Sequence, residues 1–147
     1  MGMYDSIEVS ASGLSAERLA MDVIANNLAN VNTTRTPEGG AFKRQLVVFS
    51  QKEEPQAADS IDGTPDPSKS RAGVQAVGIV NDQSPDKLVY DPSHPDADAT
   101  GYVHMPNVDV VKEMVDMMAA SRAYEANVTA IQESRTMGTA TLGLLKA

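Results

Sequence analysis

The C-terminal part of this chain carries an apolar pattern that constrains its fold more than any other feature. Side chains recur in steps of four and three residues at Val110, Met114, Met117, Ser121, Tyr124, Val128, Ile131, Arg135, Gly138, Leu142 and Leu145. Only Ser121, Arg135 and Gly138 interrupt the apolar character of the series. Alternating steps of four and three are typical of a coiled-coil seam, because they return to the same helix face. We therefore predict a long C-terminal helix within residues 107–147, with Asn107 as its N-cap.

The N-terminal part of the chain has a similar heptad spacing of apolar residues. Apolar residues lie seven apart, with others between them, at Ile7, Leu14, Met21, Ile24, Leu28 and Val31. Asp5 can cap this helix, and Gly13 can mark a kink. The helix should fade from Asn30 to Asn32, where short amide side chains compete with the helical backbone. Residues 1–36 are thus expected to form a first axial helix.

The middle of the chain, residues 37–106, contains all eight prolines and is expected to be a polar insert. Apolar runs predict short strands at 42–49, 74–80 and 87–90. Residues 51–71 have the composition of a mobile loop, and residues 91–101 form a turn-rich connector. The predicted fold is mainly α with a small β insert, in which the two terminal helices pair as one discontinuous coiled-coil domain.

Composition excludes several classes of function. The net charge of −8 argues against nucleic acid or an anionic membrane surface as the partner. No apolar run approaches the roughly 20 residues of a membrane span, so direct membrane insertion is not expected. The chain has no cysteine, which removes disulfides, thiol catalysis and cysteine-bound zinc. The first residues lack the basic and apolar regions of a secretory signal.

One cluster has residues that could perform chemistry. Carboxylates and imidazoles alternate at Asp91, His94, Asp96, Asp98 and His104, and such groups can hold a divalent cation. Prolines flank His94, however, and the glycine of a calcium loop is missing. We expect a solvated connector, with no catalytic residue, metal or cofactor. A metal-dependent enzyme is the alternative, which metal titration would distinguish.

The candidate functional residues are instead those of an assembly interface. On the N-terminal helix they are Leu14, Met21, Ile24, Asn26, Asn27, Leu28, Asn30 and Val31. On the C-terminal helix they are Val110, Met114, Met117, Ser121, Arg122, Tyr124, Val128, Ile131, Leu142 and Leu145. Each group also has a plainer interpretation: the asparagines as a frayed helix end, the methionines as helix core, and Arg122 and Tyr124 as a surface and a core residue.

Two sets of motifs resemble the flagellar rod and hook proteins of bacteria. The first comprises Ser12-Gly13-Leu14-Ser15-Ala16-Glu17-Arg18-Leu19 and Ala25-Asn26-Asn27-Leu28-Ala29-Asn30-Val31-Asn32-Thr33. The second comprises Tyr90-Asp91-Pro92-Ser93-His94-Pro95-Asp96-Ala97, Gly101-Tyr102-Val103-His104-Met105-Pro106-Asn107-Val108 and Ser121-Arg122-Ala123-Tyr124-Glu125-Ala126-Asn127-Val128. The second set resembles one proximal-rod member of this family in particular, and the similarity covers essentially the whole chain.

The resemblance implies a structural subunit of the proximal rod, assembling helically into a shaft that transmits motor torque. It implies contacts with copies of itself, other proximal rod proteins, the adaptor and export-gate components at the rod base, and the distal rod protein. It also implies a place in the flagellar basal body, reached through the flagellar type III export apparatus without a cleaved signal peptide. Another axial paralogue is the alternative, although the short middle region and the Asp-Pro-Ser-His-Pro motif favour the proximal rod member.

Overall fold

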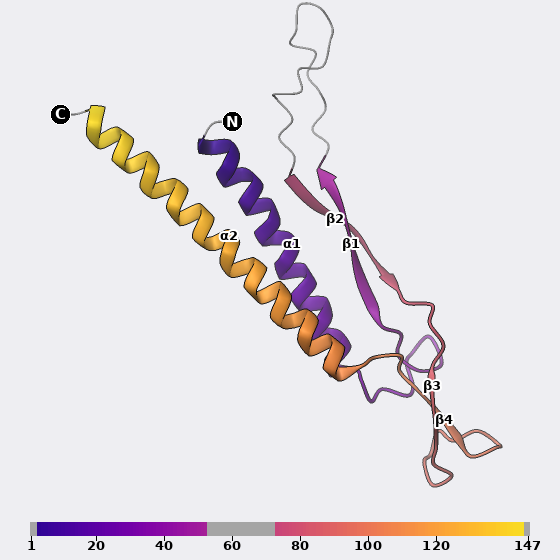
Figure 1. Ribbon diagram of the computed structural model, residues 1–147. Helices are drawn as coiled ribbons and strands as arrows, with labels where there is room; N and C mark the ends of the chain where they lie inside the picture. Colours follow the sequence, from indigo (N-terminus) through magenta and orange to yellow (C-terminus); the bar gives the residue numbers. More distant parts are fainter. Residues whose placement is uncertain (1–2, 53–72, 146–147) are drawn as a thin grey trace, which may run out of the picture.

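The computed structural model describes residues 3–52 and 73–145 of the 147-residue chain. Two long helices, α1 (Met3–Ala29) and α2 (Val110–Leu145), lie side by side (Figure 1). Between them in sequence come two hairpins, the first of β1 (Gln45–Lys52) and β2 (Gly73–Asn81), the second of β3 (Lys87–Tyr90) and β4 (Tyr102–Met105). The predicted fold, helical at both ends with a small β region in the middle, is confirmed.

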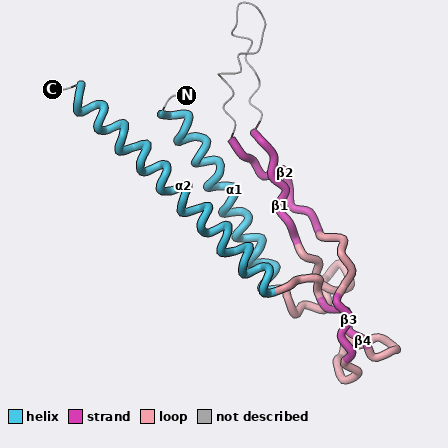
Figure 2. Tube along the Cα trace, in the orientation of Figure 1, coloured by secondary structure: helices cyan, strands magenta, loops and turns pink. Residues whose placement is uncertain are grey.

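Helix α1 lies between α2 and the first hairpin. This helix contacts α2 along one side and the β1–β2 hairpin along another, whereas the β3–β4 hairpin contacts neither helix among the described elements. Figure 2 shows the second hairpin beyond the end of the helix pair where α1 finishes and α2 begins. No helix in the described ranges is long and apolar enough to cross a membrane.

Helix α1 differs from the prediction at its start and agrees with it at its end. It already begins at Met3, so Asp5 lies in its first turn and the prediction that Asp5 caps it was wrong. It also runs through Gly13 without a break. The helix ends at Ala29, and the backbone N–H of Thr33 donates to the carbonyl of Asn30 at 3.0 Å in the turn that follows, as the asparagine-rich end predicted.

Helix α2 begins two residues later than an Asn107 cap would require. The cap is Asp109, whose carboxylate accepts the N–H of Val111 at 2.9 Å. The Asn107 side chain is used elsewhere: its oxygen accepts the backbone N–H of Arg44 at 2.7 Å, and its amide donates to the carbonyls of Asp82 and Ser84. Either residue type suits an N-cap; the tertiary contact with Arg44 decides which one serves.

The strands follow the sequence prediction with two changes. β1 begins and ends three residues later than expected, so Gln51 and Lys52 are strand residues, and residues 53–71 of the predicted mobile loop lie outside the described residues. β3 spans the predicted residues, but its partner β4 was not predicted. In the first hairpin the register shifts between Val48 and Phe49, leaving Val77 unpaired as a bulge.

The two helices run antiparallel in one fixed register. Ser6 lies against Ser134, Gly13 against Asn127, and Asn27 against Glu113. Moving seven and then fourteen residues forward in α1 therefore moves seven and then fourteen back in α2. Met3 accordingly stands level with Met137, and the last turns of α2 extend past the first described residue of α1.

Candidate assembly interface

The contact between α1 and α2 is lined by small and polar side chains. The buried residues on this face are Ala16, Val23 and Asn27 of α1, and Glu113, Ala120 and Ser134 of α2. At Gly13 a Cβ atom would come within 3.0 Å of the Asn127 side chain, so the missing side chain lets the helices approach closely. The residues buried most completely in this contact are therefore small or polar, with Val23 as the exception.

The observed inner face of α2 is half of the predicted seam. Met117, Tyr124 and Ile131 are half-buried, as expected for seam positions. The alternate positions are occupied by Glu113, Ala120, Asn127 and Ser134, each one residue before Met114, Ser121, Val128 and Arg135. One residue is a rotation of about 100° around a helix, so the second half of the predicted seam is turned towards the side of the pair.

A buried polar network closes the end of the helix pair near the hairpins. Glu113 is 0% exposed and accepts hydrogen bonds from the Arg44 Nε and, at 3.0 Å, from the Asn27 amide. The second guanidinium nitrogen of Arg44 reaches Asp116 at 3.1 Å. Asn27 also forms two hydrogen bonds of 2.8 Å with the backbone of Gln45. The network ties together the end of α1, the start of β1 and the first turn of α2.

This network was missed by sequence reasoning, although one signal was present. Glu113, Ala120, Asn127 and Ser134 are seven residues apart, a heptad line as regular as the apolar one beside it. A search for large apolar residues at heptad spacing instead selects the neighbouring line, which contains Met114 and Val128. Burying Glu113 is favourable only because Arg44, 69 residues away in sequence, supplies the opposite charge.

The N-terminal candidates fall into two groups. Leu14, Met21, Ile24, Leu28 and Val31 are half-buried, leaving part of each side chain accessible. The asparagines form a ladder in which the Asn30 amide donates to the Asn26 side-chain oxygen at 3.0 Å, while the Asn26 amide donates to Gln45. Asn27 is 1% exposed and its amide is engaged within the subunit, so it is not accessible to a neighbouring subunit in this conformation.

The C-terminal candidates include the most exposed apolar residues of the helix. Met117, Ser121, Tyr124, Val128 and Ile131 are half-buried, whereas Val110, Met114, Arg122 and Leu142 are exposed; the burial of the Leu145 side chain is outside what the structure describes. Around Met114 the exposed surface continues over residues that were not predicted, namely Val111, Val115 and Met118. These positions share one face of the helix, directed away from α1.

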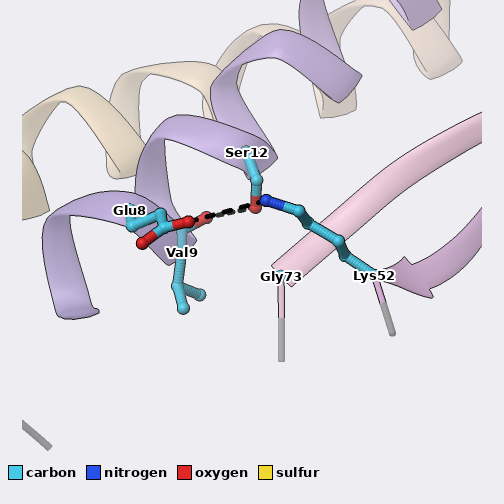
Figure 3. Close-up of a pocket in the computed structure, with 5 residues that line it drawn as sticks. All are labelled: Glu8, Val9, Ser12, Lys52 and Gly73. Carbon is cyan, nitrogen blue, oxygen red and sulfur yellow. Dashed lines mark hydrogen bonds and ion pairs between the residues drawn. The ribbon is translucent and has the colours of Figure 1, made fainter. Parts of the chain in front are cut away.

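The hairpins also present apolar side chains to the surface. On β1–β2 the exposed residues are Val48, Phe49, Val74, Val77, Ile79 and Val80; on β3–β4 they are Leu88, Val89, Tyr90 and Tyr102. The first hairpin is fixed to α1 by polar contacts. Lys52 lies 3.5 Å from Glu8, a pair shown in Figure 3. The Ser12 hydroxyl also accepts the N–H of Val74 at 3.1 Å. The hollow between these residues is therefore part of the hairpin attachment.

The acidic connector serves to build turns. Asp98 accepts hydrogen bonds from Thr100 and from the backbone N–H of Tyr102, and Asp91 accepts them from Ser93. These bonds, led by the hydroxyls of Thr100 and Ser93, lower the pKa of both carboxyl groups, which are thus held ionised. His94 accepts the N–H of Asp96, and His104 faces Asp86 at 3.5 Å. Within the described ranges, no three His, Asp or Glu side chains converge as a metal site would require.

Comparison with known proteins gives the family of the chain. The family model described as "Flagella basal body rod protein" matches residues 7–35, and the model "Flagellar basal body rod FlgEFG protein C-terminal" matches residues 99–144. The first matched region covers most of α1, and the second covers β4 and most of α2. Both helices of the pair are therefore matched.

Curated relatives match over nearly the whole length. The flagellar basal-body rod protein FlgC of Borreliella burgdorferi is 46% identical, with 99% of each chain covered. FlgC of Bacillus subtilis is 41% identical over 93% of this chain and 94% of the relative, and FlgC of Escherichia coli O6:H1 is 40% identical over 98% of both. The chain belongs to the FlgC family of flagellar basal-body rod proteins.

Proposed function

We propose that this structural subunit of the proximal rod assembles helically, with copies of itself and with other proximal rod proteins, into the shaft that transmits motor torque. Its further neighbours are the adaptor and export-gate components at the rod base and the distal rod protein. It leaves the cytoplasm unfolded through the flagellar type III apparatus without a cleaved signal peptide, and it acts without catalysis. The similarity to FlgC relatives motivates each of these assignments.

The exposed apolar surface is the structural observation that supports assembly. Val111 is 70% exposed, and Met114, Val115 and Met118 beside it are each more than half exposed. Contiguous apolar patches of this kind mark interaction sites in soluble proteins. Because this apolar surface faces away from α1, it is available to neighbouring subunits.

The proposed interface is the predicted set without Asn27. On α1 it comprises Leu14, Met21, Ile24, Asn26, Leu28, Asn30 and Val31, and on α2 it comprises Val110, Met114, Met117, Ser121, Arg122, Tyr124, Val128, Ile131, Leu142 and Leu145. We further propose that α1 and α2 are two strands of a coiled coil. Along α1 the buried or half-buried residues Gly13, Ala16, Ala20 and Val23 recur in steps of three and four, which supports this packing.

Complementation of a strain lacking the gene tests the proposal. Wild-type protein should restore rods in isolated basal bodies viewed by electron microscopy, and Met114→Asp should not, because it places a charge in an apolar contact. Met114 is exposed in the subunit, so the purified variant should keep the wild-type circular dichroism spectrum. Intact rods in the deletion strain, or in cells carrying Met114→Asp, would contradict the proposal.

A further inference from the structure

The outer face of α2 has an apolar part and a basic border. Its first two turns expose Val111, Met114, Val115 and Met118, a stripe about 10 Å long at ~1.5 Å per residue. The two acids of this stretch, Glu113 and Asp116, are both bound to Arg44. The other charges within residues 110–122 are Lys112 and Arg122; Arg122 forms no ion pair with any described residue, and the exposed Glu125 follows it one turn later.

The β3–β4 hairpin offers a surface of the opposite character. Directly opposed residues of an antiparallel pair share a face, so Tyr90 and Tyr102 lie together, with Leu88 two residues along. The two rings pack edge-to-face at 5.2 Å, and all three side chains are exposed, Tyr90 by 65%. Gly101 leaves room for this arrangement, because a Cβ there would come within 2.9 Å of the Tyr90 ring.

The turn beyond this aromatic face is acidic. Asp91, Asp96 and Asp98 lie between the two strands. Two of these carboxylates are held in place by hydrogen bonds inside the turn, and Asp96 accepts the Thr34 hydroxyl at 2.8 Å. The hairpin contacts neither helix of its own chain, so in this conformation its aromatic face is free to meet another molecule.

We infer that the β3–β4 hairpin of one copy docks on the outer face of α2 of a second copy. Leu88, Tyr90 and Tyr102 cover the apolar stripe, and the acidic turn lies over Arg122. The aromatic face of the hairpin is about 7 Å long from Leu88 to Tyr90 and about 4.8 Å wide between the two strands. A face of this size fits within the apolar stripe of α2, which is about 10 Å long. Tyrosine on one side and methionine on the other suit a tight contact that adapts to small changes in geometry.

We take the contact to be head-to-tail. One hairpin–α2 contact between two copies then leaves an unused hairpin and an unused α2 face, through which the contact propagates. This inference rests on the proposed self-assembly of the chain, and it specifies one of the contacts that self-assembly would use.

Cysteine cross-linking tests the contact, and the absence of natural cysteines makes the outcome unambiguous. Cells lacking the gene would express two variants together, Leu88→Cys and Met114→Cys, and isolated rods would be oxidised. A disulfide-linked dimer of the two variants is expected, since the Cβ atoms must come within about 4.5 Å for the bond to form. The matched control replaces Met114→Cys by Met137→Cys, a methionine of the same helix that is 62% exposed against 54% for Met114.

The outcomes separate this inference from the proposed function. Rods that contain both variants but give no Leu88–Met114 dimer, or as much dimer with the control, would overturn the contact and leave the rod assignment intact. Absence of the wild-type chain from isolated rods would instead overturn the rod assignment itself.

Exchanging the two opposed charges gives a second, independent test of the contact, which applies even if the cysteine variants do not enter rods. Arg122→Asp should reduce swimming by opposing the acidic turn, and Asp96→Arg in the same chain should restore it. Asp96 is chosen because Asp91 and Asp98 form the hydrogen bonds inside the turn, whereas the carboxylate of Asp96 accepts only the exposed Thr34 hydroxyl among the described residues. Failure of Asp96→Arg to restore swimming in the Arg122→Asp background would count against the contact.

Discussion

The buried ion pair between Arg44 and Glu113 leads to the most quantitative prediction. Arg44→Met keeps an unbranched apolar stem and removes the guanidinium charge, leaving Glu113 fully buried with only the Asn27 amide as a donor. Removing one partner of a buried pair costs about 3–5 kcal/mol, because the remaining charge is neither solvated nor paired. A small domain has about 5–15 kcal/mol of stability in total, so the variant should lose a large fraction of it.

Denaturant unfolding of the purified chain, followed by far-ultraviolet circular dichroism, measures this loss as a shift of the midpoint. The matched control is Lys52→Met, which breaks the pair with Glu8. Both side chains of that pair are nearly half exposed, at 43% and 49%, so water already screens the interaction. We expect a change of less than about 1 kcal/mol for this control.

A double variant separates the loss of charge pairing from a packing defect. Arg44→Met with Glu113→Gln removes both charges and keeps a side-chain oxygen for the Asn27 amide. It should recover most of the stability lost in Arg44→Met, since neutral replacement of a buried pair is often tolerated. An Arg44→Met midpoint equal to the wild type, or a double variant no more stable than the single one, would refute the reasoning.

Three further predictions concern the helix pair and the acidic turn. Gly13→Leu should destabilise the chain by about 1–3 kcal/mol in thermal unfolding, because its Cβ meets the opposing helix at 3.0 Å; Gly143→Leu, where nothing lies within 4 Å, should not, and equal effects would contradict the close approach. Val128→Asp should be exported yet fail to form stable rods, while Glu133→Ala swims normally, and swimming Val128→Asp cells with intact rods would show that this face is not an interface. The lowered pKa of Asp98 means that the folded turn binds its proton less readily than the unfolded chain, so stability from this group is present above the ordinary value of 3.8 and is lost as pH falls through the lower folded value. The protection of the turn amides, taken relative to the exchange of the unfolded chain at the same pH, should therefore fall as the pH drops below 3.8, and unchanged protection would argue against this origin.

The features that were predictable from the sequence are those encoded locally. The two helices follow from periodicity, the end of α1 from its asparagines, and β3 from a short apolar run bounded by polar residues. The turn at Gly39 and Gly40 is also encoded locally, because both residues have the positive φ angles, 91° and 81°, that glycine adopts readily.

The features that were not predictable depend on contacts between distant segments. β4 is a strand only because it pairs with β3, and Asp109 caps α2 because Asn107 is occupied by Arg44. The inner face of α2 is set by how closely two helices can approach, which favours Ala120 and Ser134 over the larger residues beside them. Hydrophobic periodicity locates the buried face of a helix only to within about one residue. In α2 a shift of one residue is enough to move a side chain from the inner face to the flank of the helix pair.

The position of the Arg44–Glu113 network has a mechanical consequence. The buried Arg44–Glu113 pair, with Asn27, fixes α1 to α2 near their hairpin end, whereas Ser6 meets Ser134 through a hydroxyl contact and Gly13 meets Asn127 at close approach. The helix pair is therefore clamped at one end, like a cantilever. A twisting load on the subunit should be resisted most strongly at the clamp, with the elastic deformation concentrated towards the chain termini.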